Sequence, residues 1–121
     1  MPGVSFIEYK GKKILYEDYS GLTPKTFRPY IDIAKQIISK EPRASVRALV
    51  NVTDAKFDME VTTAMMDFVK ANTAYIKASA IFGLAGLQSV VYRTIVTVTG
   101  RSNLKLCASE QEAKDYLAGL E

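Results

Sequence analysis

The sequence has no histidine and a single cysteine, Cys107. Histidine is the most common general base near neutral pH and the most common metal ligand, so its absence removes the usual catalytic centres of hydrolases. One cysteine excludes an internal disulfide and a thiolate zinc cluster. We therefore expect a protein that is not an enzyme, with no catalytic residue, no metal ion and no cofactor.

Long apolar runs are missing as well. No stretch approaches the roughly 20 residues that a membrane-spanning helix needs. The first residues, MPGVSFIEYK, lack the apolar region of a signal peptide. We therefore expect no transmembrane segment and a cytoplasmic location.

Basic residues are scattered along the chain. The formal net charge is +3, and the densest basic group, Lys10, Lys12 and Lys13, flanks a predicted turn. A nucleic-acid-binding surface would need a basic stripe on one face, preferably with aromatic stacking positions. We therefore expect no nucleic-acid partner.

The residues that are present are typical of one globular domain. The chain has 121 residues, of which 48% are hydrophobic and 24% are charged, enough to bury one core. No internal repeat, low-complexity tract or linker divides it. We predict a single domain over residues 1–121.

The N-terminal part predicts a β-hairpin followed by a helix. Two strand-like runs, Val4–Tyr9 and Lys12–Tyr19, flank a turn at Lys10-Gly11, where glycine can adopt a positive φ. Thr23 is a good N-cap and Pro24 suits the first helical position. Apolar residues then recur at helical spacing: Phe27, Tyr30, Ile31, Ala34, Ile37 and Ile38.

The rest of the chain predicts three more strands and three more helices. The strands are residues 45–54, 76–83 and 102–108. Asp58 can cap the second helix, whose inner side carries Met65, Phe68, Val69 and Asn72. The last helix, 109–121, starts with a capping box formed by Ser109 and Glu112, and its inner face consists of Ala113, Tyr116, Leu117 and Leu120.

Residues 87–99 give two conflicting signals. Their valines, isoleucine and threonines favour a strand, whereas their apolar spacing of i, i+3, i+4, i+7, i+8 and i+11 favours a helix. β-Branching costs a helix only tenths of a kcal/mol per residue, and thirteen residues are long for a strand. We predict a helix here, and a strand at 87–98 would overturn the topology below.

The predicted order is β-β-α-β-α-β-α-β-α. Strands that alternate with helices indicate an α/β fold with a mostly parallel sheet, right-handed crossovers and helices packed on the sheet. The N-terminal hairpin should add an antiparallel edge.

Several strings, in this order and spacing, resemble the SpoIIAA-like family of small bacterial proteins. That family is related to STAS domains and is grouped with CRAL-TRIO-type lipid-transfer folds. The strings are YKGKKILYEDYSGL, SVRALVNVTDAKFD, NTAYIKASAIFGLAGLQ and TGRSNLKLCASEQEAKDYL. The run between the last two strings also matches, and the resemblance covers nearly the whole chain.

The resemblance implies a binding role and no reaction. STAS relatives are typically protein-binding switches, and the best-known group antagonises anti-sigma factors. In that group a serine of a DSSG-like motif, at the helix start after the central strand, is phosphorylated by the partner kinase. The corresponding stretch here, FDMEVTTAM, lacks the paired serines and the glycine. Thr62 and Thr63 are the only nearby hydroxyls and therefore the only candidate phosphosites.

Two polar or glycine-rich stretches could bind a ligand. Gly83-Leu84-Ala85-Gly86 lacks the lysine and the spacing of a nucleotide-binding loop, so it is either a turn with close backbone approach or a helix start that binds an anion. Thr53, Asp54, Asp58 and Glu60 follow the central strand. They could bind a hard cation or form a strand end, a turn and a helix cap.

The apolar residues allow further interpretations. Met59, Met65, Met66, Phe57 and Phe82 could adapt to a partner or an acyl chain, or could simply form core. Met65 and Met66 are adjacent and cannot share one side of a helix. Cys107 is expected to be a small buried hydrophobe.

Three functional hypotheses follow. The first is a STAS-like module that binds a protein partner or itself. The second is a carrier of a lipid or another apolar small molecule in a cleft between helices and sheet, and the third is a metal-dependent hydrolase or transferase that uses Asp54 or Asp58. The candidate binding surface for the first two comprises Thr53, Asp54, Phe57, Asp58, Thr62, Met66, Gly83 and Gly86.

Overall fold

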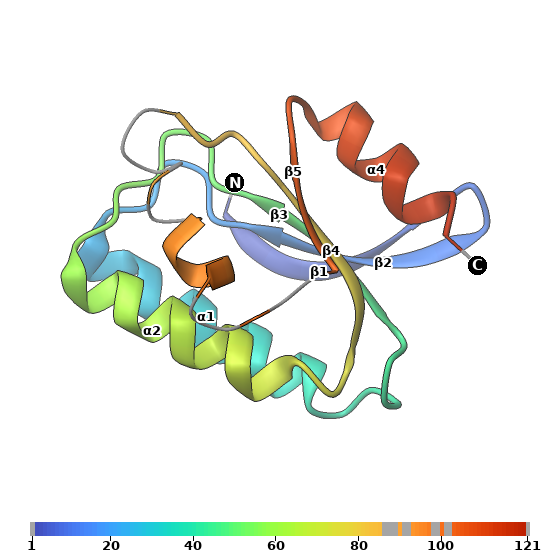
Figure 1. Ribbon diagram of the computed structural model, residues 1–121, viewed down its shortest axis with the longest axis horizontal. Helices are drawn as coiled ribbons and strands as arrows, with labels where there is room; N and C mark the ends of the chain where they lie inside the picture. Colours follow the sequence, from blue (N-terminus) through green and yellow to red (C-terminus); the bar gives the residue numbers. More distant parts are fainter. Residues whose placement is uncertain (1, 86–89, 91–92, 98–99, 101–102, 121) are drawn as a thin grey trace.

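The computed structural model describes residues 2–85, 90, 93–97, 100 and 103–120. Within them, five strands form one sheet in the order β1-β2-β3-β4-β5 (Figure 1). The strands are β1 Gly3–Tyr9, β2 Lys12–Asp18, β3 Val46–Asn51, β4 Ile76–Phe82 and β5 Leu104–Cys107. The labelled helices are α1 Pro24–Ile38, α2 Met59–Asn72 and α4 Glu110–Ala118. None of the helices in these ranges has the length and hydrophobicity that crossing a bilayer requires.

Strands β1 and β2 form the predicted hairpin. They pair antiparallel from Gly3 opposite Asp18 to Tyr9 opposite Lys12. Both turn residues have positive φ, 50° at Lys10 and 78° at Gly11, as a two-residue type I′ turn requires. The hairpin leaves β1 as the antiparallel edge of the sheet.

The other three strand pairs are parallel, so each connection must cross over the sheet. The strands follow one another in spatial order, and right-handed crossovers in one direction all fall on the same face. Helices α1 and α2 accordingly lie side by side below the sheet, and α4 returns over the opposite face (Figure 1). The predicted α/β fold with a mostly parallel sheet is confirmed.

Each face of the sheet buries its own apolar layer. On β3, Ala48 and Val50 pack toward α1 and α2, whereas Leu49 packs toward α4 with Ala113 and Leu117. This alternation is the period-2 pattern of a strand that is covered on both faces.

The predicted helix starts are confirmed, with one variation. The Thr26 hydroxyl accepts a hydrogen bond from the Thr23 N–H at 3.0 Å, and the Asp58 carboxylate accepts one from the Val61 N–H at 2.8 Å. At α4, Ser109 Oγ accepts from the Glu112 N–H at 3.2 Å. The Glu112 carboxylate accepts from the N–H of residue 108 instead of completing the predicted box at Ser109.

The described part of the segment 87–99 is helical. Residues 90 and 93–97 have helical backbone, and the Thr94 hydroxyl donates to the Val90 carbonyl at 3.0 Å. Ile95 is buried against Met65 and Val69 of α2, while Arg93 is exposed. Among the described members of the predicted apolar side, Ile95 is buried, whereas Val90 is 59% exposed and Thr94 is exposed. The helical backbone is therefore as predicted, and the buried side is only partly so. The other residues of this prediction lie outside the described part of the chain.

Candidate functional site

The loop between β3 and α2 leaves the carboxyl edge of the sheet in two turns. Asn51 Oδ1 accepts a hydrogen bond from the Thr53 N–H at 3.0 Å, and Asp54 has a left-handed φ of 57°, which aspartate tolerates. Backbone hydrogen bonds from Gly21 N to the Thr53 carbonyl at 2.9 Å and from Lys56 N to the Leu22 carbonyl at 2.9 Å join this loop to the start of α1. The helix starts of α1 and α2 therefore lie at one edge.

Gly83 packs directly against this loop. Its φ is 89°, and a Cβ there would lie 2.3 Å from Thr53 Oγ1 and 2.6 Å from the Thr53 backbone nitrogen. Only glycine fits such an approach. Of the two sequence interpretations, the structure matches the turn with close backbone approach. Gly86, the other glycine of that turn, lies outside the described residues.

The two candidate phosphosites lie in the first two turns of α2. The Thr62 hydroxyl donates to the Asp58 carbonyl at 2.8 Å, and the Thr63 hydroxyl donates to the Met59 carbonyl at 3.0 Å. Thr62 is half-buried and Thr63 is exposed. Both hydroxyls therefore form hydrogen bonds within the helix, and the helix N-cap is the carboxylate of Asp58.

Methionines occupy three different environments on α2. Met65 is buried in the core, Met66 is half-buried, and Met59, the first helical residue, is 85% exposed. Met59, Thr63 and Met66 are spaced i, i+4 and i+7, so they lie along one line on the outer side of α2. We call this line the α2 crest. Phe57 stands just before it, half-buried, with its ring 5.3 Å from that of Phe27.

A groove runs between α1 and α2 beside this crest. It consists of two adjoining hollows of about 520 and 450 Å³ that share Arg28, Glu60 and Ala64. We call it the α1–α2 groove. Its lining residues are Pro24, Lys25, Arg28, Pro29, Ile31, Asp32, Asp58, Met59, Glu60, Val61, Thr63, Ala64 and Asp67.

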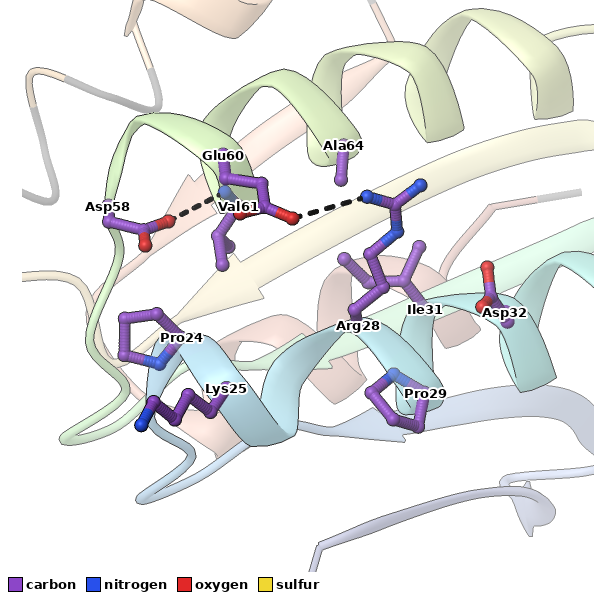
Figure 2. A pocket seen from close by; sticks show the side chains of 10 residues that line it. All are labelled: Pro24, Lys25, Arg28, Pro29, Ile31, Asp32, Asp58, Glu60, Val61 and Ala64. Atoms are coloured by element: carbon purple, nitrogen blue, oxygen red, sulfur yellow. Dashed lines mark hydrogen bonds and ion pairs between the residues drawn. The ribbon is translucent and has the colours of Figure 1, made fainter.

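One ion pair bridges the α1–α2 groove. The Arg28 side chain extends from α1 toward α2, and its Nη1 lies 3.6 Å from Glu60 Oε1 (Figure 2). The side chains are 60% and 78% exposed, so water screens their attraction. Asp32 and Asp67, on the α1 and α2 sides, have no hydrogen-bond or ion-pair partner among the described residues.

The opposite face of the sheet holds α4 with a hydrogen-bond chain. The Tyr16 hydroxyl donates to Glu110 Oε1 at 2.7 Å and accepts from Asn51 Nδ2 at 3.2 Å. Burial, followed by the hydrogen bond to Glu110, raises the pKa of Tyr16 to about 12. The hydrogen bond from Tyr16, helped by Lys114, lowers the pKa of Glu110. Because Asn51 also binds the Thr53 N–H, this chain links α4 to the β3–α2 loop.

A second polar cluster joins α4 to the hairpin turn. Asp115 Oδ1 accepts from the Tyr9 hydroxyl at 2.7 Å and from Lys10 Nζ at 3.0 Å. These bonds, Tyr9 first, together with one from Gln111, lower the pKa of Asp115 to about 2.

The buried reactive groups are enclosed by core. Cys107 is buried as predicted, and burial raises the pKa of its thiol. The Tyr19 hydroxyl donates to Glu17 Oε1 at 2.8 Å, both residues being buried beside Phe27. Burial and then the Glu17 charge raise the pKa of Tyr19 well above its ordinary value. This pair is shielded from solvent, and the Tyr19 ring, 5.0 Å from that of Phe27, packs the end of β2 against α1.

Acidic residues do not converge on a metal site in the described ranges, where no group of three His, Cys, Asp or Glu side chains could hold an ion. An apolar cavity of about 30 Å³ lies between α2, the sheet and Ile95. This volume is about that of one methyl group or one water.

The structure gathers part of the predicted surface and separates the rest. Thr53, Asp54, Asp58 and Gly83 meet at the carboxyl edge of the sheet. The remaining described members, Phe57, Thr62 and Met66, lie at or beyond the start of α2.

Sequence reasoning missed the α1 side of the groove. Arg28 and Asp32 are polar residues at i, i+4 spacing on α1, and Asp67 is seven residues after Glu60 on α2. Such spacing marks the solvated side of each helix. It does not reveal which two helices are neighbours.

Solved structures of other proteins share this arrangement, and two of them are described by their fold or domain family. One is an uncharacterized protein from the DUF3478 family with a SpoIIAA-like fold, from Shewanella loihica PV-4; it has a TM-score of 0.72 and 16% identity, and the match covers 97% of this chain and 95% of that chain. The other is an anti-sigma-factor antagonist (STAS) domain protein from Planctomyces limnophilus, with a TM-score of 0.67, 10% identity and coverage of 97% and 99%.

No protein-family model matches the chain, and no curated protein matches it significantly. At these identities the two structural likenesses concern the fold. They agree with the family that the sequence strings indicated. The chain therefore has the SpoIIAA-like fold, the α/β architecture of STAS domains.

Proposed function

We propose that this protein is a non-enzymatic binding module of STAS type that binds a protein partner, or a second copy of itself, through the α2 crest and the adjoining α1–α2 groove. The observation that carries the proposal is Met59. A large apolar side chain that is 85% exposed at the first residue of a helix, beside two open hollows, is an adaptable contact point. The fold supports the proposal because STAS relatives typically bind proteins.

Binding at this surface works without a phosphorylation switch. The start of α2 already has a carboxylate at its N-cap, Asp58. The hydroxyls of Thr62 and Thr63 are engaged by carbonyl groups of the preceding turn. A phosphate on either threonine would have to give up that hydrogen bond and approach Asp58 and Glu60.

Affinity purification from the native host tests the proposal with two matched variants. Met59→Glu places a charge on the α2 crest. Ile33→Glu places the same charge at a 45% exposed apolar residue of α1 that lines neither hollow. We expect the partner to be retained by the wild type and Ile33→Glu and lost by Met59→Glu. A partner that both variants retain, or both lose, contradicts the proposed surface.

Self-association is distinguished by the mass in solution. If the partner is a second copy, light scattering gives the mass of a dimer for the wild type and of a monomer for Met59→Glu. If light scattering gives the mass of a monomer for both proteins and a partner is recovered from the host, the surface binds a different protein and not a second copy.

Carriage of a lipid or another apolar molecule is the second candidate, favoured by the wholly apolar lining of the cavity beneath Ile95. At about 30 Å³ this cavity is too small for an acyl chain, so carriage requires α2 or the segment around residue 95 to move away from the sheet. Native mass spectrometry of protein freshly purified from several hosts tests it: a bound lipid adds its mass, and a bare chain in every preparation contradicts carriage.

A further inference from the structure

The α1–α2 groove has a charge opposite to that of the whole chain. Its lining contains four carboxylates, Asp32, Asp58, Glu60 and Asp67, and two cations, Lys25 and Arg28, which leaves a net charge of −2. The chain as a whole carries +3. The groove is therefore a locally negative channel on a positively charged protein, and it attracts positively charged partners.

The α2 side of the groove has a regular pattern. Glu60, Ala64 and Asp67 are spaced i, i+4 and i+7 and therefore lie on one side of the helix. With a rise of about 1.5 Å per residue, the two acids stand about 10 Å apart along the axis. The alanine between them leaves room above the helix backbone. The pattern is two carboxylates on either side of a shallow depression.

The groove is only weakly closed by its own side chains. Among the residues that the structure describes, the one ion pair across it joins Arg28 to Glu60, at 3.6 Å and largely in water, and exposed pairs of this kind contribute little. A cation from a partner can replace Arg28 at Glu60. At Asp67 no described side chain has to be displaced.

Resting on the proposed function, we propose that the α1–α2 groove receives an amphipathic helix of a protein partner, with Lys or Arg seven residues apart flanking a small apolar residue. Two residues at i and i+7 are separated by about 10 Å on any α-helix, so a partner helix that runs along α2 places its cations at Glu60 and Asp67 together. Its apolar residue enters the depression above Ala64, and the exposed Met59 covers its end. Helix-in-groove docking of this kind uses apolar contact for affinity and charge for register.

Two designed peptides test the proposal. Each is an 18-residue helix with the same alanine and leucine positions; the basic peptide carries Lys at two positions seven apart, and the acidic peptide carries Glu there. Binding is measured by fluorescence anisotropy, and the site is mapped by amide chemical shifts of labelled protein. We expect the basic peptide to bind more tightly, with shifts confined to the residues of α1 and α2 that line the groove.

Matched charge changes in the protein give the sharpest comparison. Asp67→Lys and Glu8→Lys alter the net charge equally, and both acids are exposed without a hydrogen bond or ion pair to the described residues. We expect Asp67→Lys to lower the affinity for the basic peptide about fivefold or more, which is roughly the effect of one exposed charge contact at low salt. Glu8→Lys should change that affinity less than twofold. The double variant Glu60→Lys, Asp67→Lys should prefer the acidic peptide.

Three results overturn the inference: equal effects of Asp67→Lys and Glu8→Lys, equal binding of the two peptides, or shifts on another face. Its failure is separable from that of the proposed function. If the native partner no longer binds Met59→Glu but still binds the double variant Glu60→Lys, Asp67→Lys, the proposed function is supported. The same result contradicts a basic helix as the occupant of the groove.

Discussion

The two faces of the sheet are covered in different ways. Helices α1 and α2 bury Tyr19, Phe27, Ile31 and Val61 in a large apolar layer. In the described part of the chain, one exposed ion pair links their outer sides. Helix α4 has nine residues and buries two, Ala113 and Leu117. Side-chain hydrogen bonds join it to Tyr9 and Tyr16 of the hairpin, and Arg47 of β3 donates to the carbonyl of Leu120 just after the helix.

The difference follows from the amount of apolar surface that each helix offers. A fifteen-residue and a fourteen-residue helix with apolar stripes are held mainly by burial, so some of their outer polar residues remain available for a partner. A short helix with two buried residues needs directed hydrogen bonds to hold its position. The polar residues of α4 are therefore mostly engaged within the protein, whereas the side chains of Lys25, Asp32 and Asp67 in the α1–α2 groove have no hydrogen bond or ion pair to the described residues.

Truncation of the apolar layer under α1 should have the largest effect. Phe27 is fully buried and contacts the rings of Tyr19 and Phe57 at 5.0 and 5.3 Å. We expect Phe27→Ala to lower the free energy of unfolding by about 3–5 kcal/mol, measured by urea denaturation. Ile33→Ala, on the exposed side of the same helix, is the control and should cost less than about 1 kcal/mol. Similar losses for the two variants would contradict the comparison of faces.

Loss of the Tyr16 hydroxyl, which holds α4 on the sheet, should lower the free energy of unfolding by a smaller amount. We expect Tyr16→Phe to cost about 1 kcal/mol, because it removes the hydrogen bonds to Glu110 and Asn51. Hydrogen exchange should speed up in α4 and at the Thr53 amide and stay unchanged in α1. Tyr116→Phe is the matched control, since the Tyr116 hydroxyl has no hydrogen bond among the described residues. Unchanged exchange in α4 would show that the Tyr16 hydroxyl does not hold the helix.

The smallest effect should be a pH dependence at Asp115. Its pKa is lowered from the ordinary 3.8 to about 2. The stability that it contributes is therefore fully present above about pH 4 and is lost as the pH falls toward 2. Asp115→Asn should be less stable than the wild type at pH 5, and the difference between their free energies of unfolding, measured by urea denaturation, should disappear near pH 2. A difference between Asp115→Asn and the wild type that stays constant from pH 5 to pH 2 would contradict the assignment.

Much of the fold could be predicted because the local signals agree with one another. The Lys10-Gly11 turn, the Thr23-Pro24 start and the Asp58 cap each act within a few residues, and the structure contains all three. The candidate site was predicted only in part. Thr53, Asp54 and Asp58 follow the central strand, and strand ends of a parallel sheet meet at one edge. Arg28 and Asp32 were missed because their role depends on a neighbouring helix.

By itself the sequence determined the order and type of the described elements, the apolar side of α1, α2 and α4 and the absence of a histidine-based site, because these depend on residue type and short-range spacing. The tertiary structure alone decided that Gly83 lies against Thr53, that Tyr16 connects α4 to the β3–α2 loop, and that Arg28 and Glu60 face each other across a groove. These contacts join residues from 30 to 94 positions apart. Hydrophobic periodicity tells which side of a helix is buried, and only the packing of the helices on the sheet determines which exposed sides become neighbours.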